Sequence, residues 1–184
     1  PKKFLKIIGF WENPSSYINL IDEFNNYFVS THKFLPAYIK SNNYICMHIR
    51  RGDYVDSKDQ IQSLLSRYSS IQHLINSLIL IPNKYEKLPL YIVTDDKVWT
   101  NSWAYLFAEK FKKEIKVLSN ESIIDWSIMR HASINISANS TFSYTAALLN
   151  STNKRNKLRC IIPQWHRSKE STYEKGWNTP NGFI

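Results

Sequence analysis

The sequence is poor in glycine, cysteine and long apolar runs, and each shortage excludes a class of protein. Only 4 of the 184 residues are glycine, which excludes collagen-like chains and Gly-rich linkers. The 2 cysteines, Cys46 and Cys160, stand in apolar stretches, so we expect buried free thiols and neither a disulfide framework nor a zinc site. No apolar run approaches the roughly 18 to 20 residues of a membrane span, and no signal-peptide pattern opens the chain. Because the first residue is Pro1, we expect further residues in front of it.

Several common ligand-binding motifs are missing as well. The sequence contains no G-x-x-x-x-G-K-[S/T] segment, no G-x-G-x-x-G segment, no H-E-x-x-H segment and no pair of closely spaced cysteines. These absences disfavour a P-loop nucleoside triphosphatase and a dinucleotide oxidoreductase.

The charge of the chain is strongly positive. Lys and Arg number 24 against 15 Asp and Glu, a net charge of +9, and residues 151–184 hold seven basic and two acidic residues, a local excess of +5. A basic surface suits a phosphate-bearing ligand, an anionic membrane or a nucleic acid, and an ordinary solvated surface is an equal alternative. The hydrophobic fraction of 43% and the charged fraction of 21% are those of a globular domain.

Segments typical of strands alternate with segments typical of helices. Short runs rich in β-branched and aromatic residues predict strands at 44–49, 90–94, 115–118, 133–138 and 159–162. Apolar residues at helical spacing predict helices at 15–29, 60–80, 98–112 and 141–149. This alternation predicts an α/β fold in which helices cover both faces of a parallel sheet.

Polar clusters follow three of the predicted strands. Residues 48–53 (HIRRGD) close the first strand, residues 94–96 (TDD) close the second, and residues 139–143 (NSTFS) lie between the fourth strand and a helix. In a parallel sheet with flanking helices, these clusters meet at the carboxyl edge, where ligands bind. We therefore expect the binding site at this edge.

Arg50 and Arg51 directly follow a buried strand. A guanidinium held at a rigid strand end suits a diphosphate, because its fork donates two parallel hydrogen bonds. The alternative is that an arginine pairs with Asp53 in a structural turn. Because adjacent side chains on a strand point to opposite faces, we expect one arginine to hold the ligand and the other to pair with Asp53, with Gly52 allowing a sharp turn.

Three further residues are candidates for ligand contacts. His48 lies on the same side of the strand as Arg50 and is a candidate for a hydrogen bond to a base or sugar, or for proton transfer; the alternative is a core histidine with satisfied hydrogen bonds. Asp95 and Asp96 are candidates to accept the paired N–H donors of a guanine, and the alternative for Asp96 is the N-cap of the helix at 98–112. No third carboxylate lies at a spacing that suggests a metal site.

The segment from Asn139 to Ser143 combines an amide, several hydroxyl groups and the free N–H groups of a helix start. This combination binds phosphate through hydrogen bonds and the helix dipole. Simple capping of the helix is an equal alternative from these residues alone.

Several of these segments resemble the motifs of one enzyme family in their order along the chain. Residues 48–55 (HIRRGDYV) and residues 139–143 (NSTFS) resemble the H-x-R-R-G-D-Y and N-S-[S/T]-F-S motifs of the α-1,2-fucosyltransferases. The other matches are residues 9–11 (GFW) with Tyr17, residues 94–96 (TDD), Asp125 with Met129, and residues 162–165 (IPQW). The ordered set runs across residues 10–166 and is more specific than any single motif.

The resemblance implies an enzyme that moves L-fucose from GDP-fucose to a galactose hydroxyl of a glycan, in α-1,2 linkage, with inversion and without a metal or other cofactor. It also implies a GT-B-like fold of two Rossmann-like domains. Residues 41–184 would then be the GDP-sugar-binding, Rossmann-like domain, and residues 1–40 part of the acceptor-side or inter-domain region.

The resemblance also implies roles for individual residues. Arg50 would hold the donor diphosphate, while His48 and one of the two aspartates would lie near guanine. The candidate donor-binding set is His48, Arg50, Arg51, Asp95, Asp96, Asn139, Ser140, Thr141, Phe142 and Ser143. The candidate catalytic residues are Arg50, Asp53 and His48. The base that accepts the acceptor's proton is left open among Asp53, Asp56, Asp59 and His48.

Two departures from the family pattern affect the expected acceptor and sugar. Residues 142–149 (FSYTAALL) lack the tryptophan pair of the family's F-S-W-W-G-A-W-L. The Cys and His that the family commonly carries between Met129 and Asn139 are not at their places. Neither departure touches the expected diphosphate site.

Two other functions and the location of the protein stay open from the sequence. One alternative is a nucleotide-sugar-binding module without turnover. The other is a basic nucleic-acid-binding domain, which is disfavoured because the aromatic residues fall on helical core stripes. We expect a bacterial cytoplasmic protein at the inner face of the membrane, where the basic segment 154–159 would contact acidic lipid, or a Golgi lumenal protein in a eukaryote.

Overall fold

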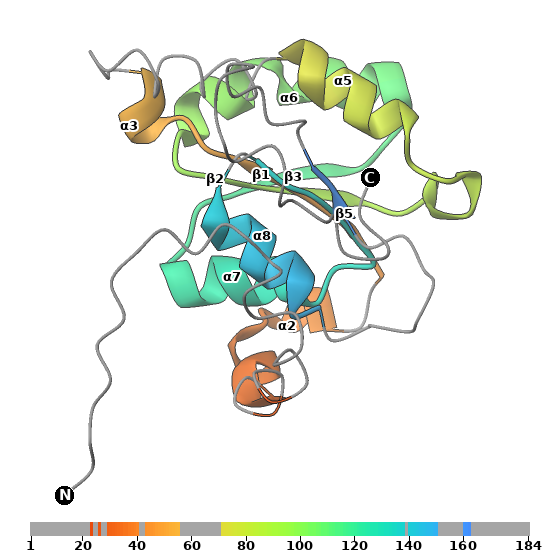
Figure 1. The fold of residues 1–184 in the computed structure, drawn as a ribbon. Helices are drawn as coiled ribbons and strands as arrows, with labels where there is room; N and C mark the ends of the chain where they lie inside the picture. The colour runs from red at the N-terminus through yellow and green to blue at the C-terminus, as the bar shows by residue number, and fades with distance from the viewer. Residues whose placement is uncertain are drawn as a thin grey trace, which may run out of the picture.

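A computed structural model gives the fold of the chain (Figure 1). It describes residues 29–40, 43–55, 71–138, 140–150 and 160–162, together with Glu23 and Asn26. Most of the predicted helix at 15–29, the first half of the one at 60–80 and the basic segment 154–159 lie outside the described residues.

The described strands form one sheet of five parallel strands in the order β3-β2-β1-β4-β5. The strands are β1 (Ile45–Ile49), β2 (Leu90–Thr94), β3 (Ile115–Leu118), β4 (Ile134–Ile136) and β5 (Cys160–Ile161). Each of them lies within a segment that the sequence predicts as a strand. The α/β class and the Rossmann-like parallel sheet are therefore confirmed.

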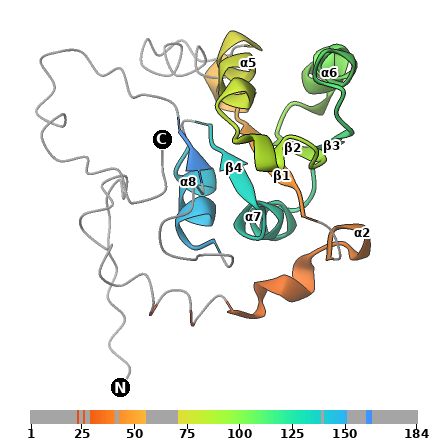
Figure 2. The same cartoon turned by 90° about the vertical axis from the view of Figure 1, so that its right-hand side faces the viewer.

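Helices cover both faces of this sheet (Figures 1 and 2). On one face lie α5 (Ile71–Ile79) and α6 (Lys97–Phe111), and on the other lie α7 (Ser122–Arg130), α8 (Thr141–Leu148) and α2 (Ala37–Lys40). Three short elements complete the described chain: the 3-10 helices η3 (Val29–Phe34) and η5 (Asn83–Tyr85), and α3 (Gly52–Val55), which follows β1. Because both faces are covered, the central strands carry continuous apolar runs in place of alternation.

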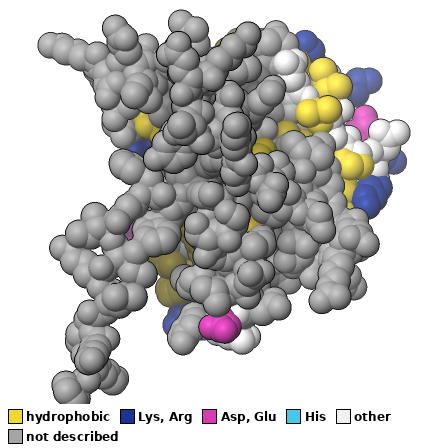
Figure 3. Space-filling view, viewed as in Figure 1, with side chains coloured by type: hydrophobic (Ala, Val, Ile, Leu, Met, Phe, Trp, Pro, Cys, Tyr) yellow, Lys and Arg dark blue, Asp and Glu magenta, His cyan; other side chains and the backbone are white. Residues whose placement is uncertain are grey.

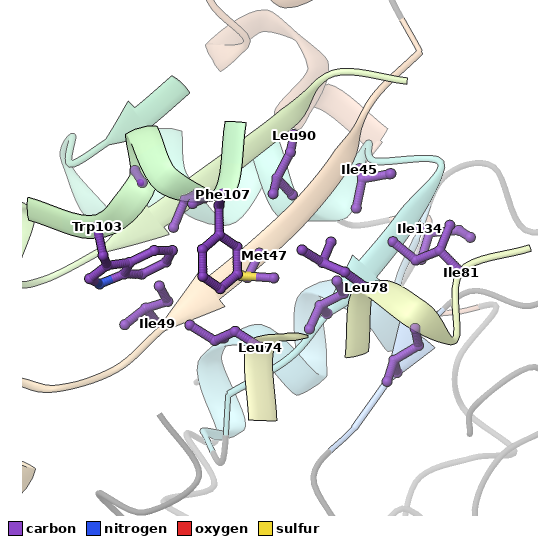
Figure 4. Close-up of a cluster of buried hydrophobic side chains, with 14 residues drawn as sticks. Ile45, Met47, Ile49, Leu74, Leu78, Ile81, Leu90, Trp103, Phe107 and Ile134 are labelled. Atoms are coloured by element: carbon purple, nitrogen blue, oxygen red, sulfur yellow. The ribbon is translucent and has the colours of Figure 1, made fainter. Parts of the chain in front are cut away.

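The side chains of each strand divide between two cores. Ile45, Met47 and Ile49 of β1 pack with Leu74 of α5 and Phe107 of α6 (Figure 4). Cys46 of the same strand belongs to the opposite core, with residues of α7 and α8. Successive side chains thus point to opposite faces, as the pleat of a strand requires.

The segment before β1 is packed onto this domain. Leu35 and Ile39 are buried in the same core as Cys46, Tyr91 and Val93. Residues 29–40 therefore share a hydrophobic core with the sheet. The proposed domain boundary after residue 40 stays a prediction.

The two cysteines are buried free thiols, as predicted. The Sγ atom of Cys160 lies 3.2 Å from the hydroxyl oxygen of Ser137, which satisfies both groups. Burial raises the pKa of Cys160 to about 12, so this thiol stays protonated and unreactive at neutral pH.

The described surface carries charges of both signs. In the view of Figure 3, Lys and Arg side chains lie beside an acidic one and beside exposed apolar ones. Exposed apolar side chains of the described helices include Ile79 of α5 and Val98 of α6. No helix among the described residues is long and apolar enough to cross a membrane.

Candidate functional site

The residues that follow β1, β2 and β4 meet at the carboxyl edge of the sheet. The register pairs Ile49 of β1 with Thr94 of β2, and Met47 of β1 with Ile136 of β4, so the segments after these strands start side by side. The strand order also reverses here, because β2 and β3 lie on one side of β1 and β4 and β5 on the other. The crevice outside such a reversal is the usual ligand site of open α/β sheets.

Arg50 and the main chain of Arg51 bind the same carboxylate. Nη1 of Arg50 lies 3.0 Å from Oδ2 of Asp95, and the backbone N–H of Arg51 donates to Oδ1 of Asp95 at 2.8 Å. The two side chains of the ion pair are 38% and 26% exposed, so solvent reaches both. The guanidinium of Arg50 also lies 5.7 Å from the ring centroid of Tyr54.

Gly52 makes room for this carboxylate. A Cβ atom at Gly52 would lie 2.9 Å from Oδ2 of Asp95, closer than such contacts occur. From the sequence, we expect Gly52 to permit a sharp turn. The structure gives it a steric role in addition, since any side chain here would push Asp95 away.

Arg51 is fixed by a second set of contacts. Its Nε donates to Oδ2 of Asp96 at 3.2 Å, and its guanidinium carbon lies 3.7 Å from the ring centroid of Trp99. Asp96 is the N-cap of α6, and its Oδ1 accepts from the backbone N–H of Trp99 at 3.0 Å. The capping role of Asp96 is thereby confirmed. Arg51 finds its carboxylate at the end of β2, whereas the side chain of its predicted partner, Asp53, lies outside the described ones.

His48 is buried with an unsatisfied ring nitrogen. It is 7% exposed, its ring centroid lies 5.8 Å from that of Phe142 on α8, and its Nδ1 has no hydrogen-bond partner among the described residues. Burial lowers the pKa of His48 to about 4; Arg50 lowers this pKa further and Asp95 opposes the shift. His48 is therefore neutral at pH 7 and a weak base, which suits a hydrogen bond to a ligand better than proton abstraction.

The segment after β4 brings hydroxyl groups to the same edge. Ser140 is the N-cap residue of α8, yet its side chain makes no capping hydrogen bond. The hydroxyl of Ser143 donates to the carbonyl of Ser140 at 3.2 Å and is buried, while Thr141 is exposed. Ser140 and Thr141 thus leave the first turn of α8 accessible to an anion. Asn139 lies outside the described residues.

Two residues of the recognised motif set support the fold. The carboxylate of Asp125 accepts from the backbone N–H of Asn120 at 3.0 Å and from its side-chain amide at 2.7 Å, and burial raises the pKa of Asp125. Met129 is 1% exposed in the core. Asp125 therefore stabilises the turn that leads into α7, and Met129 packs this helix into the core.

The structure does not describe the side chains of the aspartates that are candidates for the base that takes the acceptor's proton. Asp56 and Asp59 lie outside the described residues, as does the side chain of Asp53. Among the residues that are described, no three His, Cys, Asp or Glu side chains gather in a way that could hold a metal ion.

Sequence reasoning misses the role of Trp99 and includes Thr94 in a polar cluster without giving it a role of its own. Trp99 is interpreted there only as part of a core stripe, yet its ring supports Arg51. The hydroxyl of Thr94 accepts from the backbone N–H of Asp96 at 3.0 Å and from the hydroxyl of Thr100 at 3.1 Å. The only signal in the sequence is the spacing of three residues between Asp96 and Trp99, which is that of a helix cap and the amide it binds.

A sequence profile of glycosyl transferase family 11 matches residues 2–181, and the chain belongs to this family. The resemblance to α-1,2-fucosyltransferases that the motifs indicate is confirmed at this level.

Individual relatives give a finer comparison. An α-1,2-colitosyltransferase of Escherichia coli is 24% identical over 153 residues, which cover 80% of this chain and 52% of the relative. The chain thus spans about half the length of this curated relative. Crystal structures of POFUT1 with GDP and with GDP-fucose are each 15% identical and superpose with a TM-score of 0.44; they cover 70% of this chain and 43% and 42% of POFUT1.

Proposed function

We propose that this chain is the donor-binding part of a GT-B-like glycosyltransferase that moves L-fucose from GDP-fucose to a galactose hydroxyl of a glycan, in α-1,2 linkage. The guanidinium of Arg50 and the backbone N–H of Arg51 both bind the carboxylate of Asp95, at the point where the strand order reverses. This shared anion-binding geometry is the observation that carries the proposal. Membership of glycosyl transferase family 11 and the ordered motifs support it.

The chemistry of the transfer accounts for these groups. The fucosyl group passes through a cationic, oxocarbenium-like state while GDP departs with its negative charge. Arg50 and the N-terminal turn of α8, at Ser140 and Thr141, stabilise this departing charge as preorganised donors. Such stabilisation acts in the transition state and therefore raises turnover as well as donor affinity.

The neutral His48 has a binding role in this scheme. Its buried Nδ1 has no hydrogen-bond partner among the described residues, and its ring centroid lies 5.8 Å from that of Phe142. We infer that donor binding brings a hydrogen-bonding group of the nucleotide or sugar to this nitrogen. The proton of the acceptor hydroxyl then passes to a carboxylate. We infer that Asp53, Asp56 or Asp59 supplies it, since the low pKa of His48 makes that residue a poor base.

A second donor sugar is favoured by one specific observation. The Escherichia coli relative is an α-1,2-colitosyltransferase, and colitose is fucose without its 3-hydroxyl group. The departure of residues 142–149 from the family pattern falls beside Ser143, close to where the sugar is expected. GDP-colitose is therefore the alternative donor, and it would use the same diphosphate site.

Binding measurements with a panel of donors test this proposal. We expect calorimetry to show binding of GDP, GDP-fucose or GDP-colitose that persists in EDTA, and no comparable binding of UDP-galactose. Equal binding of UDP-galactose, or a signal that needs manganese, would contradict the proposed donor class. Binding without any transfer to a galactoside, in the protein extended to the length of its family relatives, would favour the nucleotide-sugar-binding module in place of the enzyme.

We propose further that the protein works at the cytoplasmic face of a bacterial membrane, close to a glycan acceptor. The support is the run of four basic residues at 154–159, which would be attracted to acidic lipid. Co-sedimentation with vesicles of phosphatidylglycerol and phosphatidylcholine should weaken steeply as salt is added. Absence of co-sedimentation at low salt would remove this part of the proposal.

A further inference from the structure

At the carboxyl edge, a side chain of the protein itself, that of Asp95, occupies the groups that could bind an anion. The Arg50 guanidinium binds one oxygen of the Asp95 carboxylate at 3.0 Å, and the backbone N–H of the adjacent Arg51 binds the other at 2.8 Å. Gly52 leaves the space that this carboxylate needs. A guanidinium beside a main-chain N–H, with a glycine next to them, is an arrangement that binds phosphate oxygens equally well.

We propose that Asp95 is an internal competitor for the donor's diphosphate: its carboxylate occupies the position of a phosphate group on Arg50 and on the Arg51 N–H, and donor binding displaces it. This inference rests on the proposed function and adds to it the residue that sets how tightly the nucleotide is held. Asp95 is then neither a guanine-binding residue nor a permanent support of Arg50.

The exposure of the pair makes the exchange feasible. Both side chains of the Arg50–Asp95 pair are in contact with solvent, at 38% and 26% exposure, and exposed ion pairs contribute little to stability. A diphosphate offers more charge and more acceptor oxygens than one carboxylate, so it competes effectively for the same donors. Arg51 differs, because its guanidinium is held by Asp96 and by the ring of Trp99 and does not need to move.

The same exchange assists the end of the reaction. After transfer, GDP stays on Arg50 with its full charge, and a bound product slows the next turnover. The return of Asp95 to Arg50 replaces the contacts that GDP loses, and its negative charge repels the leaving diphosphate. Asp95 therefore weakens nucleotide binding and speeds product release, a step that limits turnover in many enzymes.

The substitution Asp95→Asn tests this inference, because it removes the charge and keeps the shape of the side chain. We expect the variant to bind GDP and inorganic pyrophosphate roughly three- to tenfold more tightly than the wild type. Glu114→Gln is the matched control. Glu114 precedes β3 at the opposite edge of the sheet, is 64% exposed and pairs with Lys116 at 3.5 Å. Its substitution changes the net charge equally, and we expect it to alter either affinity less than about twofold.

The outcomes separate this inference from the proposed function. A tighter Asp95→Asn variant supports the competitor role, since loss of a purely structural contact would not raise affinity. Equal or weaker pyrophosphate binding in a variant with a normal melting curve overturns it, as does a protein that binds no pyrophosphate at all. If pyrophosphate binds and responds to the substitution while GDP and GDP-sugars do not bind, the donor assignment fails and the competitor role stands.

Discussion

The guanidinium of Arg51 lies against the indole ring of Trp99, 3.7 Å from the ring centroid, while its Nε binds Asp96. Its neighbour Arg50 pairs with Asp95 at 3.0 Å and lies 5.7 Å from the ring centroid of Tyr54, and solvent reaches the Arg50–Asp95 pair. Two adjacent arginines thus have different tasks. Arg51 ties the end of β1 to the start of α6, and Arg50 presents its charge at the edge where a ligand binds.

Substitution of Arg51 by Lys should therefore lower stability. Lysine keeps the charge but loses the planar stacking on Trp99 and the directed Nε–H bond to Asp96. We expect a loss of about 1 to 2 kcal/mol in the free energy of unfolding, measured by urea denaturation. A variant as stable as the wild type would show that the contact with Trp99 contributes nothing.

Substitution of Arg50 by Lys should leave stability nearly unchanged and weaken nucleotide binding. The pair with Asp95 is exposed, so its loss should change the free energy of unfolding by less than about 1 kcal/mol. Loss of the fork should weaken GDP binding roughly 10- to 100-fold and lower turnover as well, because the contact strengthens as GDP departs. A normally folded Arg50→Lys protein with near-native affinity and turnover would contradict the assignment of Arg50 to the diphosphate.

A buried arginine on the far face should be essential to stability. The side chain of Arg130 is buried; its Nε donates to the carbonyl of Leu149 at 2.8 Å and its Nη1 to the hydroxyl of Thr31 at 2.6 Å. Replacement by Met removes both of these buried hydrogen bonds and should lower the free energy of unfolding by about 2 to 4 kcal/mol. Lys110→Met, an exposed position on α6, is the control and should stay within about 0.5 kcal/mol. Similar denaturation midpoints for both variants would refute this role.

Two histidines should make the protein sensitive to mild acid. Burial lowers the pKa of His48 to about 4, and burial, with Arg130 and His32 nearby, lowers the pKa of His131 to about 4. The ordinary pKa of histidine is 6.5, so the unfolded chain takes up these protons first as the pH falls. Stability should therefore decrease from pH 6.5 to pH 4, by about 3 kcal/mol for His48, and this contribution should then level off.

Variants measure each histidine's share of this loss. His48→Gln and His131→Gln should each show a shallower fall of the free energy of unfolding between pH 6.5 and pH 4 than the wild type. Urea denaturation at intervals of half a pH unit provides the comparison. Parallel curves for all three proteins would mean that other groups cause the acid sensitivity.

The central strands were predictable because they are buried on both faces. Residues 45–49 and 90–94 are short, largely apolar runs that need no alternation, and the structure places β1 and β2 at those residues. The convergence of polar clusters at one edge follows from the parallel order of these strands. The fold and the convergence of these clusters could thus be inferred from local patterns alone.

Helix α7 could not be recognised in the same way. Its buried residues include Asp125, Ser127 and Arg130, so the helix shows no clean apolar stripe against a polar one. The partner of Arg51 could not be predicted either, because the register between β1 and β2 is what places Asp96 beside it. Contacts between distant segments of this kind have no local signature in the sequence.

The most direct test of the account is transfer itself. The protein, extended to the length of its family relatives, should move fucose from GDP-fucose to a β-galactoside in EDTA, and NMR of the product should show an α-1,2 linkage. Transfer that requires a UDP-sugar or an added metal, or a product with another linkage, would contradict the central claim.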